Sequence, residues 1–226
     1  MKFIRLAAAC AVLTLSPAVM AGVVLSEGFD NVAGLPGAGW VQINNSDSPA
    51  NPYFQGNPGV FPSFAGAANS YIAANFQSGA PRISNWLLTP VLDLASQFVI
   101  DFMVRAAGEG FLDGVEVRLS TSGASTNVGV GPLATGDFST LLGSYFSDTD
   151  DGWVAEQFGT GGLAAGTQGR LAFRYVVADT NVDGNYLGID SVSVNVTQPV
   201  SVPEPTSLAL VGLALAGLVT SRRRSG

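Results

Sequence analysis

The segment Phe98-Val99-Ile100-Asp101-Phe102-Met103-Val104-Arg105 indicates the fold class of this chain. Every second residue in it is large and apolar, which is the period of a β-strand with one buried face. The same alternation recurs at 115–120 and 171–177, whereas no comparable helical period lies between the two ends of the chain. Gly, Asn, Asp, Ser and Pro separate the segments and are typical of turns. We therefore predict an all-β domain, a jelly roll or β-sandwich, over residues 22–197.

The N-terminal residues 1–21 do not belong to this pattern. Lys2 and Arg5 precede a short apolar run, and the small side chains around Val19-Met20-Ala21 suit cleavage by signal peptidase. We therefore expect a signal peptide that is removed after Ala21.

A second apolar run, at residues 207–220, lies near the C-terminus. Its 14 residues, rising 1.5 Å each, cover roughly 21 Å of the ~30 Å hydrocarbon layer. Arg222, Arg223 and Arg224 follow directly, and arginines beside a membrane helix favour its cytoplasmic side. The run is thus predicted to be a single membrane-spanning helix, separated from the domain by a linker at 198–201.

The tail resembles a known sorting signal. Pro203, Glu204 and Pro205 precede the apolar run and the arginine cluster, and this order over residues 202–226 resembles the PEP-CTERM sorting signal of Gram-negative bacteria. The resemblance implies export across the inner membrane, a transient hold in that membrane and processing by an exosortase. The protein would then reside at the cell surface or outside the cell.

The composition of the middle of the chain excludes several kinds of chemistry. Between the two ends the only basic residues are five arginines, and all but Glu204 of the 17 acidic residues lie there. Such an acidic domain is unsuited to nucleic acid. The chain has no histidine and its one cysteine lies in the signal peptide, so histidine-based triads, thiol chemistry and disulfides are excluded. We expect no enzyme, although paired carboxylates leave a glycoside hydrolase as a less favoured alternative.

Two long loops interrupt the predicted strands. Residues 44–69 lack periodicity but contain four aromatic residues, and we expect these to anchor the loop on the sheet rather than form a contact surface. They are Tyr53, Phe54, Phe61 and Phe64. Residues 120–136, rich in Ser, Thr and Gly, form the second predicted loop.

Three short blocks, in this order, resemble the choice-of-anchor J domain, which is similar to cleaved-adhesin and MAM-type jelly rolls. They are Ser26-Glu27-Gly28-Phe29-Asp30-Asn31 with Gly39-Trp40, Asn85-Trp86-Leu87-Leu88-Thr89-Pro90-Val91-Leu92-Asp93-Leu94, and Tyr186-Leu187-Gly188-Ile189-Asp190-Ser191-Val192-Ser193-Val194. The resemblance implies a secreted, surface-attached module without catalysis, and several relatives bind structural calcium.

Strand phase singles out two carboxylates. Strict alternation turns Glu27 inward on the first strand and Asp190 inward on the last. A buried carboxylate needs a cation or several donors, so we hypothesise a structural calcium bound by Glu27 and Asp190, with Asp30 as a further ligand. The alternatives are a salt bridge to an arginine or a bulge that turns the carboxylate out.

Two further motifs have less specific signals. Asp179-Thr180-Asn181-Val182-Asp183-Gly184 has the opening of an EF-hand loop, but no helices flank it and the same residues suit a hairpin turn. Trp40 and Trp153 could stack on a sugar, whereas Trp86 lies in a strand-like block and is expected in the core.

The sequence as a whole favours an exported, non-enzymatic protein of the cell surface or extracellular matrix, used for adhesion or structural interaction. Expected partners are signal peptidase and an exosortase during export, the inner membrane, and a polysaccharide or surface protein. A carbohydrate-binding module in a secreted polysaccharide layer is the alternative.

Overall fold

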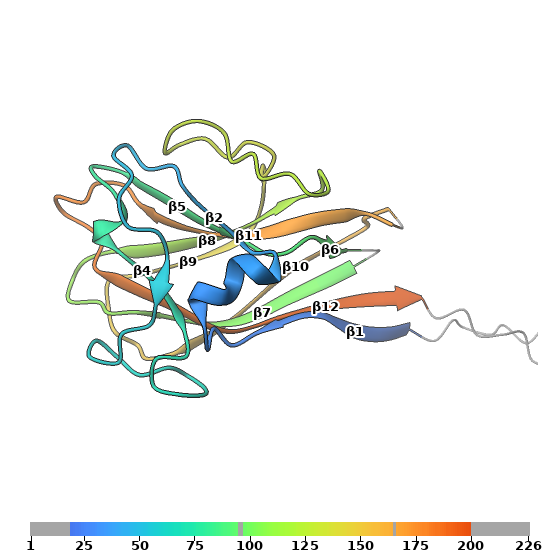
Figure 1. The fold of residues 1–226 in the computed structure, drawn as a ribbon, viewed down its shortest axis with the longest axis horizontal. Helices are drawn as coiled ribbons and strands as arrows, with labels where there is room; N and C mark the ends of the chain where they lie inside the picture. Colours follow the sequence, from blue (N-terminus) through green and yellow to red (C-terminus); the bar gives the residue numbers. More distant parts are fainter. Residues whose placement is uncertain (1–18, 95–96, 165, 200–226) are drawn as a thin grey trace, which may run out of the picture. The chain divides into compact units, whose positions relative to one another are not determined.

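The computed structural model describes residues 19–94, 97–164 and 166–199. In this part of the chain, two antiparallel sheets pack face to face, as the period of two predicts (Figure 1). Residues Ala21–Gln198 form one compact unit. Residues 1–18 of the predicted signal peptide, the sorting motif and the membrane helix lie outside the described residues, whereas residues 19–21 belong to the first strand. Among the described residues no helix is long and apolar enough to cross a membrane.

Sheet A has the strand order β10-β7-β12-β4-β3, and β1 pairs with β12. The strands of this sheet are β1 (Val19–Glu27), β3 (Phe54–Gln55), β4 (Ile72–Asn75), β7 (Gln97–Ala106), β10 (Val154–Gly161) and β12 (Tyr186–Pro199). Eight residues of β10 pair with β7, from Val154 opposite Val104 to Gly161 opposite Gln97.

Sheet B has the order β2-β5-β11-β8-β9, and β6 pairs with β11. Its strands are β2 (Val41–Asn44), β5 (Ile83–Leu88), β6 (Leu92–Asp93), β8 (Asp113–Ser120), β9 (Thr140–Ser147) and β11 (Gln168–Val177). Two short 3-10 helices, η1 (Val32–Ala38) and η2 (Phe76–Ser78), connect strands of the two sheets. Gly39 ends η1 with a positive φ of 87°, a conformation that glycine adopts without the steric cost of a side chain.

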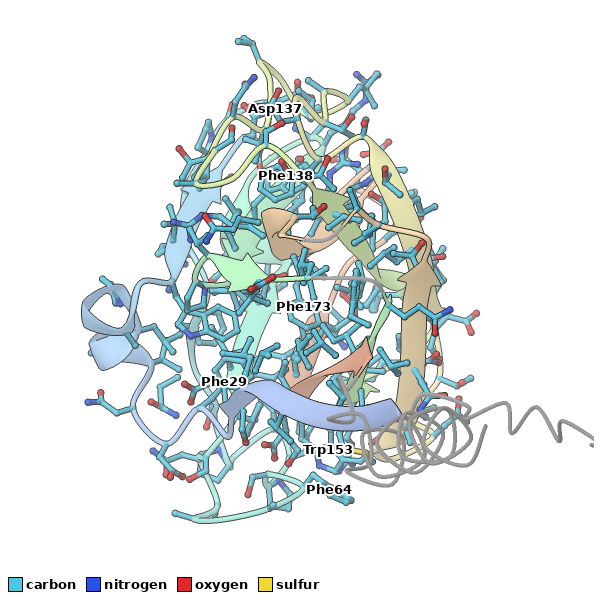
Figure 2. All side chains as sticks on the ribbon, turned by 90° about the vertical axis from the view of Figure 1, so that its right-hand side faces the viewer. Phe29, Phe64, Asp137, Phe138, Trp153 and Phe173 are labelled. Carbon is cyan, nitrogen blue, oxygen red and sulfur yellow. The ribbon has the colours of Figure 1, made fainter. Side chains whose placement is uncertain are left out.

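The predicted inward faces form the core between the sheets. Phe98, Ile100, Phe102 and Val104 of β7 are buried there against Phe173 of β11 and its neighbours. Phe102 meets Phe173 edge to face at 5.1 Å between ring centroids, a favoured aromatic geometry. Figure 2 shows Phe173 between the two layers, with Phe138 beyond one of them and Trp153 beyond the other.

The two long loops cover the outer faces of the sheets, so side chains on these faces are also buried. Residues 56–71, here called the A loop, lie over sheet A, where Phe61 and Tyr71 pack on Ala73 and Tyr186. Residues 121–139, the B loop, lie over sheet B, where Val128 and Phe138 pack on Trp86, Leu88 and Ala172. As predicted, Trp86 is fully buried, and Tyr53 and Phe61 anchor the first long loop. Phe64 is an exception because its side chain is exposed.

Candidate functional site

The predicted calcium ligands do not meet in one cluster. Asp190 is fully buried, as predicted, but a β-bulge follows it: Asp190 lies opposite Met103, and the register has shifted by one residue at Ser193 opposite Asp101. Because Ile189 before the bulge and Val192 after it both face the core, Asp190 lies on the outer face of sheet A, beneath the A loop. The expectation that strict alternation turns it toward the core is therefore wrong, and the bulge alternative is correct.

Hydrogen-bond donors already surround the Asp190 carboxylate. Its Oδ2 accepts the backbone N–H groups of Phe64 at 2.9 Å and Ala65 at 3.0 Å, and its Oδ1 accepts the backbone N–H of Ser191 at 2.6 Å and its hydroxyl at 3.2 Å. Burial raises the pKa of Asp190 above its ordinary value, although these bonds favour the charged form. Asp190 therefore anchors the A loop.

The other two predicted ligands are placed differently. Glu27 is half-buried and accepts the backbone N–H of Phe29 at 2.7 Å, while Asp30 is exposed. Calcium takes six to eight oxygen ligands, and within the described ranges no group of three or more Asp, Glu, His or Cys residues is placed to hold a metal ion. These side chains do not fit the hypothesised calcium site.

The acidic motif at 179–184 forms a turn, in agreement with the hairpin interpretation. The Asp179 side chain accepts the backbone N–H of Asn181 at 3.0 Å, a local bond typical of Asx turns. Asp183 accepts the backbone N–H of Leu112 at 3.2 Å, which ties the turn to the start of β8.

The two tryptophans proposed for sugar contact are both occupied by packing. Trp40 is only 3% exposed and meets Phe29 edge to face at 5.6 Å. Trp153 is half-buried, donates its indole N–H to the carbonyl of Pro62 at 3.0 Å, and packs edgewise on Phe61 and Tyr71. The structure therefore offers no open stacking platform formed by these two rings, because one is buried and the other closes the aromatic cluster under the A loop.

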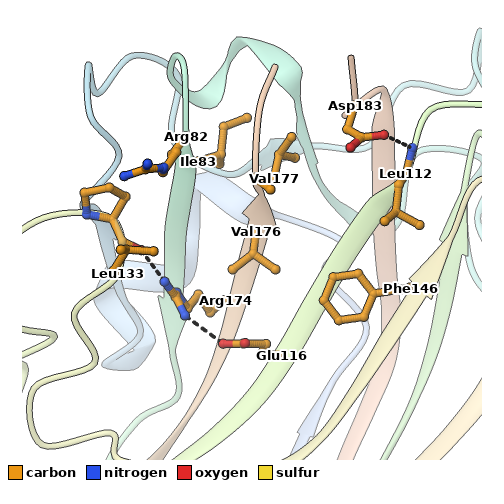
Figure 3. Close-up of a pocket in the computed structure, with 12 residues that line it drawn as sticks. Arg82, Ile83, Leu112, Glu116, Leu133, Phe146, Arg174, Val176, Val177 and Asp183 are labelled. Carbon is orange, nitrogen blue, oxygen red and sulfur yellow. Dashed lines mark hydrogen bonds and ion pairs between the residues drawn. The ribbon is translucent and has the colours of Figure 1, made fainter. Parts of the chain in front are cut away.

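A different site, which sequence reasoning missed, lies on the outer face of sheet B. A pocket of about 270 Å³ opens where β8 begins and β11 ends (Figure 3). Its polar residues are Arg82, Glu116, Arg174 and Asp183, and its apolar walls include Leu112, Leu133 and Phe146. This pocket is the candidate functional site of the described domain.

Arg174 forms the polar floor of the pocket. Its guanidinium donates to the Ser84 hydroxyl at 2.9 Å, to Glu116 Oε2 at 2.8 Å and to the carbonyl of Pro132 in the B loop. It also lies over the Trp86 ring, 5.1 Å from the centroid, which favours a cation. Arg174 is thereby held in one orientation.

Glu116 is held ionised beside Arg174. Burial alone would raise the pKa of Glu116, but hydrogen bonds from Arg118 at 2.7 Å and from Arg174 outweigh it, so its pKa lies below the ordinary value. A carboxylate committed to two guanidinium groups is a poor proton donor at neutral pH. Glu116 is therefore unsuited to be the general acid of this pocket.

The sequence does contain a weak signal for this site. Arg174 and Glu116 alternate with buried residues and are readily interpreted as solvent-facing. However, Ala172 and Val176 share the outward face of β11 with Arg174, and a strand with apolar residues on both faces indicates that something covers its outer face.

The comparisons with known proteins identify the tail and the fold. Residues 201–224 match the family described as the PEP-CTERM protein-sorting motif, which confirms the resemblance stated for the tail. The motif implies export, processing by an exosortase and sorting to the cell surface. No curated protein matches the sequence significantly.

The domain resembles solved cleaved-adhesin domains of Lys-gingipain from Porphyromonas gingivalis. The K1 domain has a TM-score of 0.56 and 25% identity, over 76% of this chain and 98% of that domain. The K3 domain has a TM-score of 0.52 and 20% identity, over 78% of this chain and 99% of that domain. The chain thus carries a PEP-CTERM sorting motif and a β-sandwich that resembles these cleaved-adhesin domains.

Proposed function

We propose that this protein is a non-enzymatic surface module that mediates adhesion or structural interaction outside the cell. The observation that carries the proposal is the combination, in one chain, of a sorting motif at 201–224 and a β-sandwich similar to cleaved-adhesin domains. We further propose that the domain is related to the choice-of-anchor J domains, because of the three sequence blocks around Glu27, Trp86 and Asp190.

Binding rather than catalysis is supported by the state of the acidic groups. The buried carboxyls with raised pKa values, Asp113 and Asp190, are fully enclosed and accept backbone N–H groups. Glu116 faces the pocket but has a lowered pKa. A glycosidase needs an accessible acid with a raised pKa opposite a second carboxylate. These three carboxyls do not supply one, and Glu156, a half-buried residue whose pKa burial raises, does not line the pocket.

Sorting is the part of the proposal that can be tested first. The full chain is produced in a Gram-negative host with and without an exosortase, and its surface exposure is followed by antibody labelling of whole cells. A variant with Pro203, Glu204 and Pro205 replaced by alanine should stay in the inner membrane, because the motif is no longer processed. A matched control with Pro199 and Val200 replaced by alanine, just before the motif, should be sorted normally.

Adhesion is tested in the same strains. Cells that display the protein are expected to attach to surfaces or to each other more strongly than cells that carry the alanine variant of the motif. Normal surface display with no change in attachment would contradict an adhesive function while leaving the sorting intact.

A further inference from the structure

The Arg174 and Glu116 floor of the pocket on sheet B is already satisfied by hydrogen bonds within the protein, whereas the apolar walls of the pocket remain exposed. All three nitrogens of Arg174 donate to protein oxygens, and Glu116 Oε2 accepts from two guanidinium groups. The walls, in contrast, include exposed apolar side chains: Leu133 is 76% exposed and Phe146 is 49% exposed. The apolar walls of this pocket therefore remain exposed to solvent, and a bound partner would bury them.

Further exposed apolar residues adjoin the same pocket. Leu112 lines it and is exposed, as are Phe111 and Val182, which are the chain neighbours of the lining residues Leu112 and Asp183. Phe146 lies flat over β8, because Gly114 beneath its ring has no side chain to hold the ring away. Exposed apolar side chains gathered in one place mark an interaction site.

The size of the cavity limits what can enter it. Its volume of about 270 Å³ lies just below the range of ligand pockets, which runs from ~300 to ~1,000 Å³. One large side chain fills such a space, whereas a folded element or an extended chain bound lengthwise does not.

The loops at this end of the sandwich carry an excess of negative charge. Six acidic residues lie in the three loops at 107–112, 148–153 and 178–185, namely Glu109, Asp148, Asp150, Asp151, Asp179 and Asp183. Arg105 neutralises Asp150 through a pair at 2.7 Å, and Arg82 lines the pocket. The loops therefore favour a positively charged partner and disfavour a negatively charged one.

The position of this end in the domain leaves it accessible. β12 begins at Tyr186, next to the loop at 178–185, and ends at Pro199, so the chain leaves toward the sorting motif at the opposite end of the strand (Figure 1). The strand has 14 residues, and the steps between them, at ~3.3 Å each, separate its two ends by about 43 Å. A partner at the pocket does not have to share space with the start of the linker.

We propose that this pocket docks a basic segment of a partner protein, which inserts one side chain of leucine or phenylalanine size between Leu112, Leu133 and Phe146. The acidic loops orient the segment, and the apolar anchor supplies the affinity. This inference rests on the proposed role as a surface interaction module and adds the chemistry of the partner.

A sugar fits the same pocket less well. Sugar recognition depends on several directed hydrogen bonds from polar groups in the site. Here the guanidinium of Arg174 and Oε2 of Glu116 are already paired within the protein. A peptide anchor needs only the apolar walls.

The test measures binding of synthetic peptides to the full chain in detergent micelles by fluorescence anisotropy. The probe is a labelled heptapeptide with four lysines around a central phenylalanine. One comparison peptide has serine at the centre, and another has glutamates in place of the lysines. Both should bind at least tenfold more weakly, and binding of the probe should fall as the salt concentration rises to ~1 M, where charges are screened beyond about 3 Å.

Paired variants locate the binding. Leu133 lies in an exposed loop, so Leu133→Ser should leave the fold intact. Combined with Phe146→Ser, it should weaken binding of the probe about tenfold. Leu141→Ser is the matched control, because Leu141 lies on the same strand as Phe146, is equally exposed at 49% and does not line the pocket.

Several outcomes would overturn the proposal. They are equal binding of the serine or glutamate peptide, loss of binding in Leu141→Ser but not in Leu133→Ser, and no binding of the probe at all. Competition by neutral oligosaccharides that depends on Leu133 would assign the pocket to a sugar instead. Each of these can occur in a chain that is normally sorted and adhesive, so failure here is distinguishable from failure of the proposed function.

Discussion

The outer faces of the two sheets are both covered by loops, but they are covered in different ways. The A loop closes sheet A with an aromatic cluster and with Asp190, whose carboxylate accepts backbone N–H groups from the loop. The B loop covers only part of sheet B and leaves a pocket lined by Arg174 and Phe146. Similar loops on similar sheets thus give one loop anchored by aromatic rings and a buried carboxylate, and one loop that leaves a pocket beside it.

The reason for the difference lies in the side chains under each loop. Beneath the A loop, Gly188 of β12 leaves room for the rings of Phe61 and Tyr71 to approach the sheet. Beneath the B loop, the long side chains of Arg174 and Glu116 stand on the strands and bond to each other and, through Arg174, to Pro132. Under the A loop a glycine lets aromatic rings reach the strand, whereas under the B loop an arginine and a glutamate occupy the strand surface and form the floor of the pocket.

The largest expected effect concerns the aromatic anchors of the loops. Phe61 contacts three aromatic rings and lies 4.5 Å below the Arg105 guanidinium, whereas the only ring near Phe138 in the described chain is that of Trp86. Phe61→Ala should lower the free energy of unfolding by about 4 kcal/mol and Phe138→Ala by about 3 kcal/mol. Urea denaturation measures both, and a larger loss for Phe138→Ala would reverse the ranking of the two loops.

Asp190→Ala removes the polar anchor of the A loop. The backbone N–H groups of Phe64, Ala65 and Ser191 would lose their acceptor in a buried position, and we expect a loss of about 3 kcal/mol in unfolding free energy. Asp101→Ala on the same outer face serves as the control, because Asp101 accepts only side-chain amides, from Gln157 and Asn195. Its expected loss is below about 1 kcal/mol, and equal losses would show that Asp190 is no special anchor.

Glu116→Gln tests the charged pair under the B loop through pH. A carboxylate with a lowered pKa stabilises the folded state above its unfolded pKa of about 4.3, and this contribution disappears as pH falls through the lower folded value. At pH 7 the variant should be less stable than the wild type by about 1–2 kcal/mol. The difference should vanish in acid, and a constant difference across pH in urea denaturation would contradict the assigned ionisation.

The smallest expected effect concerns metal removal. Because both oxygens of Asp190 already accept hydrogen bonds and Glu27 accepts one from Phe29, chelation should leave the thermal unfolding midpoint of the domain unchanged. Calorimetry with excess EDTA and with added calcium checks this. If chelation lowered the unfolding midpoint and added calcium restored it, the result would support the calcium site hypothesised at Glu27, Asp30 and Asp190.

The period of two was sufficient to predict the sandwich, because inward residues such as Phe102 and Phe173 alternate without interruption. The bulge after Asp190 was not predictable, because Ser191 adopts a φ of 51° and nothing in its residue type indicates this conformation. The sequence thus predicted the burial of Asp190 correctly but placed it on the wrong face. The pocket was not predictable either, because Glu116 and Arg174 lie far apart in the chain. Each is interpreted as a surface charge until the pairing of their strands is known.

Amide hydrogen exchange of the full chain tests the contrast between the two faces most directly. The backbone N–H groups of Phe64 and Ala65, bonded to buried Asp190, should exchange only when the A loop opens and therefore be strongly protected. The backbone N–H groups of Val130 and Leu133 in the B loop, where both residues are exposed, should exchange rapidly. Rapid exchange at Phe64 and Ala65 together with protection at Val130 and Leu133 would contradict the contrast between a firmly anchored A loop and a partly open B loop.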